Sequence, residues 1–309
     1  MPTRSQLEGA LYGLLVGDAL GVPYEFHAPE DLPPPARIDF APPAGFQRAH
    51  DGVPPGTWSD DGAQALCLLA SLLACGRLDP DDLGRRLVRW YDEGYLAVDG
   101  EVFDVGVQTG AAIRAMRAGV PALQAGPDGE GDNGNGSLMR VLPLALWHRG
   151  SDAELVRDAC LQSRVTHGHA RAQACCALYC LWARSTAERR PDGWADAVAR
   201  LRPLVASDPA LVEALEWAIR PDEPPHGTGS GYVVDCLRSA RLAVAAGPYQ
   251  VAVRTAVALG HDTDTTAAVA GGIAGLRDGA SGLPRPWLDG LRGKALVQPL
   301  VEALCAAAG

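Results

Sequence analysis

Apolar residues recur at helical spacing along almost the whole chain. Between residues 5 and 20 they occupy Leu7, Leu11, Leu14, Leu15 and Ala19, which share one face of a helix. Alternation with a period of two residues, the pattern of a half-buried strand, is nearly absent. The pattern predicts an all-α protein that folds as a single compact domain over residues 1–309. The predicted helices cover residues 5–20, 63–74, 80–95, 105–118, 152–163, 168–186, 233–246 and 249–259, with one that begins near residue 138, others broken at Pro203 and Pro209 within 192–218, and one or two more within 284–307.

One stretch interrupts this helical pattern. Val22 precedes Pro23, and a residue before proline avoids the helical conformation, so the first helix ends there. Proline is dense in the residues that follow, at positions 33–35 and 42–43. Segment 28–56 is therefore predicted to be irregular, as a lid or an excursion from the helical body.

Two aspartates lie immediately before a run rich in alanine and glycine. Asp262 and Asp264 are two residues apart, and in an extended turn such positions point the same way. Thr265 follows and opens the predicted helix, so that two carboxylates and a hydroxyl aim at one point. These hard oxygen ligands suit Mg²⁺, Mn²⁺ or Ca²⁺ rather than zinc. The competing interpretation, a capping aspartate beside a turn aspartate, needs no ligand.

A second acidic pair stands far away in the sequence. Ser59, Asp60 and Asp61 precede the apolar run 63–74, where Ser59 or Asp60 is a natural N-cap and acids suit the positive end of the helix dipole. Adjacent residues lie about 100° apart around a helix, so capping explains one acid better than the other. The pair is placed to flank or bridge metal ions.

Two glycine-rich loops lead into predicted helices. The first ends in Asp132–Ser137, and the second is Gly227–Tyr232. A glycine loop that enters a helix presents free N–H groups, the geometry that binds phosphate, while a plain turn with a cap is the competing interpretation. His167 lies at another predicted helix start. There a histidine can serve a purely structural role, with its ring hydrogen-bonded to a backbone group.

Composition narrows the class of partner. The chain has 27 Lys and Arg against 37 Asp and Glu, a formal net charge of −10, and no dense basic run, which argues against a nucleic-acid duplex. An acidic protein that binds an anionic ligand needs positive charge at the binding site, and divalent cations are the obvious source of that charge. No secretory signal or membrane-spanning stretch is evident, so we expect a cytoplasmic protein without a membrane partner.

The 8 cysteines include no Cys-x-x-Cys pair, and most lie in apolar helical runs. This is the pattern of reduced core residues in a cytosolic protein. A zinc site built from His167, His169, Cys176 and Cys180 matches no established ligand spacing.

With both acidic clusters in place, the sequence resembles the ADP-ribosylglycohydrolase family nearly from end to end. No single motif carries this resemblance, which depends on their order and intervals. The motifs are Gly17-Asp18-Ala19-Leu20-Gly21 with Glu25, Trp58-Ser59-Asp60-Asp61, Phe103-Asp104-Val105-Gly106, Gly134-Asn135-Gly136-Ser137-Leu138-Met139-Arg140, Thr166-His167 and Asp262-Thr263-Asp264-Thr265.

The resemblance implies an orthogonal all-α fold with a dinuclear cleft that holds two divalent cations, Mg²⁺ or Mn²⁺. The residues matching the ligands of one ion are Ser59, Asp60 and Asp61, and those matching the ligands of the other are Asp262, Asp264 and Thr265. Asp264 matches a ligand shared by both. The acids that match catalytic positions near the metals are Glu25 and Asp104, either of which would handle the proton.

The resemblance also implies which residues bind the substrate. Asn135, Gly136 and Ser137 match the loop that contacts the phosphates and ribose of ADP-ribose. His167 and Tyr232 match positions around the adenosine or the distal ribose. Apart from the resemblance, we expect the glycine loops at 134–137 and 227–231, which include Gly231, to neutralise the pyrophosphate through backbone N–H groups.

The implied reaction is metal-dependent hydrolysis of the glycosidic bond at C1″ of ADP-ribose, which frees a modified protein side chain or a small conjugate. Two alternatives remain: a non-catalytic ADP-ribose-binding module, and a phosphoester or pyrophosphate hydrolase that uses the same two metals. A composition rich in Ala, Arg, Gly and Pro favours arginine as the acceptor, and we expect a monomer.

Two positions depart from the family pattern. The family usually has Thr or Ser after the paired acids, where this chain has Gly62, and commonly has Gly before the second acidic motif, where this chain has His261. Neither change removes a metal ligand. His261 is expected either to alter access and acceptor preference or merely to cap a helix.

Overall fold

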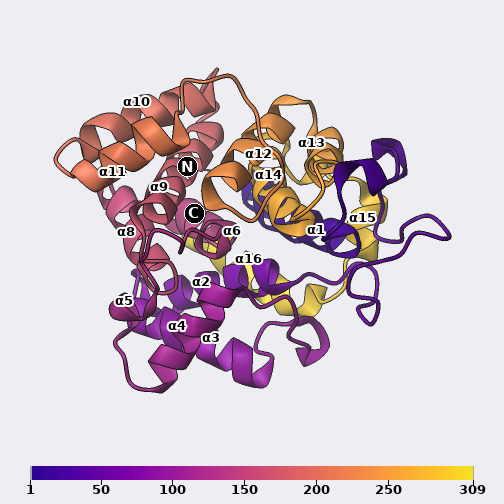
Figure 1. Ribbon diagram of the computed structural model, residues 1–309, viewed down its shortest axis with the longest axis horizontal. Coiled ribbons are helices and arrows are strands. Elements are labelled where there is room, and N and C mark those ends of the chain that lie inside the picture. Colours follow the sequence, from indigo (N-terminus) through magenta and orange to yellow (C-terminus); the bar gives the residue numbers. More distant parts are fainter. Residues whose placement is uncertain (1, 309) are drawn as a thin grey trace.

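A computed structural model of the chain describes residues 2–308, and it contains no β-strand within that range. The predicted all-α class is confirmed (Figure 1). The α-helices are α1 (Arg4–Gly21), α2 (Asp60–Cys75), α3 (Pro80–Glu93), α4 (Val107–Arg117), α5 (Ala122–Ala125), α6 (Gly136–Met139), α7 (Leu142–Trp147), α8 (Asp152–Arg164), α9 (Ala170–Ala187), α10 (Gly193–Val205), α11 (Pro209–Glu213), α12 (Val233–Ala245), α13 (Tyr249–Val257), α14 (Thr263–Asp278), α15 (Arg285–Gly290) and α16 (Lys294–Ala308).

Shorter helical pieces fill some of the connections. A π-helix, Ala214–Ile219, continues α11, and the 3₁₀-helices are Val22–Tyr24, Pro29–Asp31, Pro35–Arg37, Val98–Gly100 and Ala280–Gly282. Residues 38–59 contain no helix, so most of segment 28–56 is irregular backbone.

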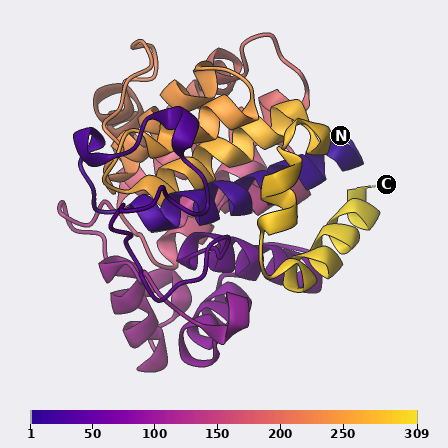
Figure 2. The ribbon, with the colours of Figure 1, turned by 90° about the vertical axis from the view of Figure 1, so that its right-hand side faces the viewer.

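Helices α1 and α14 lie side by side in the middle of the fold, as Figure 2 shows. Helix α1 carries glycine at every fourth position, at Gly9, Gly13, Gly17 and Gly21, and residues four apart share one helix face. A Cβ atom on Gly17 would lie 2.2 Å from the carbonyl oxygen of Ala267. The glycines therefore let the two backbones touch, and the start of α14 is fixed against the end of α1.

The remaining helices form two groups around this pair. Helices α8 and α10 pack against α9, which packs in turn on α14 and buries most of its own length. Helices α2, α3 and α4 form the lower part of the molecule in Figure 1, and α12 and α13 pack on α14. The hydroxyl of Tyr179 on α9 donates to the carbonyl of Val269 on α14 over 2.9 Å, which ties the first group to the centre.

Several helix boundaries differ from the sequence-based predictions. Pro203 does not break a helix: it lies in the last turn of α10, where the missing N–H removes one hydrogen bond and the helix ends two residues later. Pro209 does start a new helix, at the first position of α11. The helix predicted near residue 138 begins at Gly136 and is divided into α6 and α7.

No helix within residues 2–308 combines the length and the apolar character needed to cross a membrane. The cysteines are all free thiols, and five of them are buried in the core: Cys67, Cys175, Cys176, Cys180 and Cys236.

Candidate active site

Asp18 fixes the start of α2 against α1. It is fully buried, and its carboxylate accepts hydrogen bonds from the backbone N–H groups of Ser59 over 2.8 Å and Gly62 over 2.7 Å. Burial raises the pKa of Asp18 to about 7, although these two bonds oppose the shift. Sequence reasoning assigned Asp18 no role, but an aspartate within an otherwise apolar helix was the available signal.

The second acidic motif reaches the same point by a different route from the predicted one. Asp262 is the residue before α14 and Asp264 lies in its first turn, so the segment is a helix start and not an extended turn. The hydroxyl of Thr263 donates to the carbonyl of Gly21 over 2.8 Å, which holds this start against α1. The hydroxyl of Thr265 lies 3.3 Å from Oδ1 of Asp61, so the two acidic clusters are in contact.

Two backbone hydrogen bonds place Glu25 beside this cluster. The N–H of Phe26 donates to the carbonyl of His261, and the N–H of His261 donates to the carbonyl of His27, each over 2.7 Å. The segment after α1 thereby pairs with the segment before α14. As a result, Glu25, Asp262 and Asp264 each place a carboxylate oxygen within 4.8 Å of the others.

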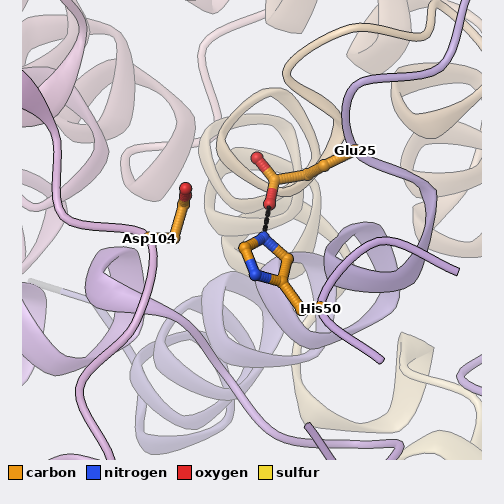
Figure 3. A group of neighbouring side chains, drawn as sticks. All are labelled: Glu25, His50 and Asp104. Atoms are coloured by element: carbon orange, nitrogen blue, oxygen red, sulfur yellow. Dashed lines mark hydrogen bonds and ion pairs between the residues drawn. The ribbon is translucent and has the colours of Figure 1, made fainter. Parts of the chain in front are cut away.

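A second group consists of Glu25, His50 and Asp104, shown in Figure 3. The Nε2 atom of His50 lies 2.5 Å from Oε2 of Glu25, and Asp104 faces them from the other side. The imidazole ring packs between the rings of Phe26 and Phe103, at centroid distances of 5.6 and 5.1 Å. His50 was not among the predicted site residues, because it comes from the irregular segment, where no periodicity indicates which side chains turn inward.

The acids of this region carry more negative charge than the protein neutralises. Burial first, and then a neighbouring carboxylate, raise the pKa values of Glu25, Asp60, Asp61 and Asp264 well above their usual range. Burial and the charge of Asp262 raise the pKa of Asp104 to about 6. No lysine or arginine within residues 2–308 forms an ion pair with any of these acids. The ion-pair partner of Glu25 is His50.

The nearest buried cation is Arg140, which acts through a glutamine. Its guanidinium donates to Oε1 of Gln64 over 3.1 Å, and Gln64 donates to Oδ2 of Asp60 over 2.8 Å. Burial lowers the pKa of Arg140 to about 10. Because Gln64 separates this one cation from Asp60, most of the negative charge of the acids remains uncompensated.

The residues fit a divalent cation. Oδ2 of Asp61 and Oδ2 of Asp264 are buried and have no hydrogen-bond donor in the described part of the chain. An unpaired carboxylate oxygen is costly to bury, and a hard cation is the partner that such oxygens prefer. Within residues 2–308, none of His167, His169, Cys176 and Cys180 belongs to a group of potential ligand residues, so that zinc combination is not brought together.

The acids open into a cavity of about 590 Å³. The predicted site residues that line it are Glu25, Asp60, Asp104, Asn135, Gly136, His167, Gly231, Asp262 and Thr265. Ser59, Asp61 and Asp264 are buried behind this wall. Tyr232 does not line the cavity and is 39% exposed.

The first glycine loop faces the cavity, with one exception. Asn135 donates from Nδ2 to Oδ2 of Asp262 over 2.7 Å, so this loop is bonded directly to the acidic cluster. His167 packs against Gly136, where a Cβ atom would lie 2.8 Å from its Cε1 atom, and burial lowers the pKa of His167 to about 3. Ser137 points away from the cavity and bonds to the hydroxyl of Ser163 over 2.9 Å.

The second glycine loop does not offer the free N–H groups predicted for it. The N–H groups of Thr228 and Ser230 donate to the carboxylate of Asp235, over 3.0 and 2.8 Å. The N–H of Gly229 donates to the hydroxyl of Ser239 over 3.0 Å. The chain therefore satisfies this loop with its own carboxylate, and of its glycines only Gly231 lines the cavity.

Both departures from the family pattern have a place in the structure. A Cβ atom on Gly62 would lie 2.7 Å from Leu15 and 2.8 Å from the indole of Trp58, so this position has no room for a side chain. His261 is exposed, lines the cavity and has a left-handed φ of 61°. It lies outside α13 and α14, so it does not cap a helix.

Comparison with known proteins agrees with this fold. The family model described as ADP-ribosylglycohydrolase matches residues 1–309, so the chain belongs to the ADP-ribosylglycohydrolase family. The predicted family and enzyme class are confirmed. A solved structure of an ADP-ribosylglycohydrolase-related protein complex is similar over 99% of both chains, with a TM-score of 0.78 and 32% identity.

Two relatives are similar over almost the whole of this chain. ADP-ribosylarginine hydrolase Tri1 of Pseudomonas putida (strain GB-1) is 33% identical over 304 residues, which cover 96% of this chain and 77% of that protein. ADP-ribosyl-dinitrogen reductase glycohydrolase of Rhodospirillum rubrum is 30% identical over 318 residues, which cover 97% of this chain and 96% of that protein.

Proposed function

We propose that this chain uses divalent cations, Mg²⁺ or Mn²⁺, to hydrolyse the glycosidic bond at C1″ of ADP-ribose, and that the group released is an arginine side chain. The observation that carries this proposal is the cluster of buried, uncompensated carboxylates beside the 590 Å³ cavity. A site with this much unpaired negative charge is built to be completed by positive charge.

The residues that would hold the cations lie at two helix starts. Ser59, Asp60 and Asp61 begin α2, while Asp262, Asp264 and Thr265 begin α14. When bound, divalent cations supply Lewis acidity that polarises substrate oxygens and stabilises charge in the transition state. Asp18 and the contact between α1 and α14 hold the two helix starts in position for this.

Glu25 is the group that handles the proton in this proposal. Its carboxylate lines the cavity and is held by His50, so it is fixed in one orientation, as an efficient acid–base group must be. Asp104 lines the same cavity and faces this pair, but it is not bonded to His50 as Glu25 is. We assign Asp104 the supporting role of adding negative charge near the bond that breaks.

ADP-ribose binds along the wall that carries the first glycine loop. Gly136 begins α6 and Asn135 precedes it, so backbone N–H groups at this helix start can face a phosphate. The imidazole of His167, whose pKa is lowered to about 3, stays neutral near pH 7 and contacts the substrate without adding charge. Gly231, from the second glycine loop, lines the same cavity.

Two observations support arginine as the released group. The guanidinium of a modified arginine is a cation, and the cavity presents the carboxylates of Glu25, Asp104 and Asp262 to it. The Pseudomonas putida relative is named for its action on ADP-ribosylarginine. Serine, in contrast, would leave as a neutral alcohol and gain less from an acidic cavity.

The test is the release of free ADP-ribose from peptides carrying ADP-ribosyl-arginine or ADP-ribosyl-serine, with Mg²⁺, Mn²⁺ or EDTA. Release from the arginine peptide that depends on the metal supports the whole proposal. Release from the serine peptide alone contradicts the acceptor, and equal rates in EDTA contradict the metal. AMP as the product would indicate a pyrophosphate hydrolase, and binding without release would indicate a binding module.

A further inference from the structure

A second cavity, of about 740 Å³, lies between the last turns of α9, α12 and α14 and the start of α10. Four arginines line it, two from the loop after α9 and one each from α12 and α14: Arg189, Arg190, Arg241 and Arg277. The indoles of Trp182 and Trp194 form part of the wall. The only carboxylate in this wall, within the described chain, belongs to Asp192.

This cavity is separate from the candidate active site. Helices α12 and α14 both begin at the active-site cavity and end at the arginine cavity. Helix α14 has 16 residues, which at 1.5 Å per residue separates its two ends by roughly 24 Å. No residue lines both cavities.

Two of the four arginines are neutralised by a carboxylate of the protein. Arg190 lies 3.2 Å from Oε2 of Glu188, and Arg277 lies 2.7 Å from Oδ1 of Asp278. Their charge is shared with these local partners, so they contribute less to the field inside the cavity.

The other two arginines have no carboxylate partner among residues 2–308. Arg241 donates from Nη1 to the carbonyls of Pro221 and Glu223 and lies 4.6 Å from the ring centroid of Trp194. Arg189 is exposed, with no ion pair or side-chain hydrogen bond in the described structure. Asp192, whose carboxylate also caps the start of α10 by accepting from Ala195, offsets part of this charge, but one carboxylate against four guanidinium groups leaves the wall with an excess of positive charge.

Four arginines at one cavity, two of them without a carboxylate partner among residues 2–308, stand out in a chain with a net charge of −10. A guanidinium group can donate two parallel hydrogen bonds to two oxygen atoms of one phosphate, which makes arginine the preferred residue for binding multiply charged oxyanions. The cavity volume falls within the range of small-molecule sites, roughly 300–1,000 Å³. We propose that this arginine cavity binds a small molecule carrying two or more phosphate groups, such as a nucleoside diphosphate.

The test is calorimetric titration of the full chain, in EDTA, with ADP, inorganic pyrophosphate and adenosine in separate experiments. We expect ADP and pyrophosphate to bind and adenosine not to bind. Tighter binding of ADP than of pyrophosphate would assign the ligand to nucleotides, and equal binding would assign it to the phosphates alone. Adenosine binding as tightly as ADP would overturn the proposal.

Variants show which cavity is responsible for the binding. Arg189→Gln and Arg241→Gln should each weaken ADP binding about tenfold or more, while Arg85→Gln, an exposed arginine on α3, should leave it unchanged. Arg189 makes no side-chain contact that folding requires, so its variant remains informative even if Arg241→Gln misfolds. Unchanged affinity in Arg189→Gln and Arg241→Gln would place the binding in the active-site cavity and overturn the proposal, as would a wild-type chain that binds neither ADP nor pyrophosphate.

Discussion

The Nε2 atom of His50 lies 2.5 Å from the Oε2 atom of Glu25, across 25 residues of sequence. This contact joins the irregular segment to the carboxylate that we propose handles the proton. Both His50 and Phe26, the residue after Glu25, have left-handed φ angles, of 50° and 63°. Such conformations cost energy in residues other than glycine and gather at functional sites, where the surrounding structure holds them.

His50→Ala should lower kcat about 10- to 100-fold and change KM little, because the imidazole orients Glu25 and does not line the cavity. His50→Gln keeps an N–H donor and should recover part of the loss. The control is His226→Gln, since His226 is exposed and contacts only its near neighbours in sequence, the carbonyl of Pro224 and the carboxylate of Glu223. Steady-state kinetics on the arginine peptide measure both constants, and a change confined to KM would contradict the positioning role.

Glu25→Gln should reduce kcat by about 10²- to 10⁴-fold, the usual contribution of a positioned acid–base group. Asp104→Asn should reduce it less, because Asp104 contributes charge only. Both substitutions preserve the shape of the side chain and remove its charge, so the difference in kcat between them measures the contribution of proton transfer. If Asp104→Asn is the more damaging change, the two roles must be exchanged.

Asp60→Ala and Asp264→Ala should abolish turnover and leave the fold largely intact, because each removes a proposed metal ligand. The measurement pairs the peptide assay with metal analysis of the dialysed protein. Asp81→Ala, an exposed acid in the first turn of α3, is the matched control and should retain both activity and metal. Full turnover in Asp60→Ala and Asp264→Ala would rule out the metal assignment.

In EDTA, the free energy of unfolding should fall as the pH rises from about 4 to about 7. The pKa is raised to about 7 for Asp18 and to about 6 for Asp104, whereas an unfolded aspartate titrates near 3.9. Within that window the folded chain binds protons that the unfolded chain has released, so each rise in pH costs stability, on the order of 1 kcal/mol per group and pH unit.

Urea unfolding at pH 5 and pH 7.5 measures this dependence. Asp61→Asn removes one uncompensated buried charge and should flatten the dependence, whereas Asp81→Asn should not. Mg²⁺ or Mn²⁺ should restore stability at the higher pH by supplying the positive charge that protons supply at the lower one. Greater stability at pH 7.5 than at pH 5 in EDTA would show that the carboxylates are neutralised by some other means.

Gly17→Ala should destabilise the protein by about 1–3 kcal/mol, the usual cost of an overpacked contact. Its Cβ atom would lie 2.2 Å from the carbonyl of Ala267, so α1 and α14 would have to separate. Gly52→Ala is the control, because a Cβ atom there meets nothing within 4 Å. Equal urea midpoints for the two variants would mean that the backbone contact yields at no cost.

The acidic clusters were predictable because their chemistry is visible in the sequence. Asp60 and Asp61 could not both be caps, whereas Asp262 and Asp264 alone were equally compatible with a cap and a turn, and only the second acidic cluster favoured a metal site. The structure brings these pairs together through Thr265 and Asp61. Helical periodicity located most of the helices as well, because each buries an apolar face.

Other parts of the site depend on contacts that local pattern does not encode. His50 reaches Glu25 only through the path of an irregular segment. Ser137 was expected in the cavity beside Gly136, but the next position on a helix turns about 100° away, and Ser137 faces the core. The second glycine loop was expected to have free donors, yet Asp235, seven residues after Thr228, accepts them.

The glycine face between α1 and α14 divides the positions around the cavity into those that the backbone contact fixes and those on loops that can change. The backbones of α1 and α14 touch, with no side chains between them that could repack. The acids at the start of α14 therefore cannot shift without a backbone clash. The side chains of Phe26 and His261 lie at the cavity on loop backbone, outside the contact between α1 and α14. A laboratory selection for new leaving groups should therefore accumulate its changes at the loops, while the chemistry of bond cleavage remains untouched.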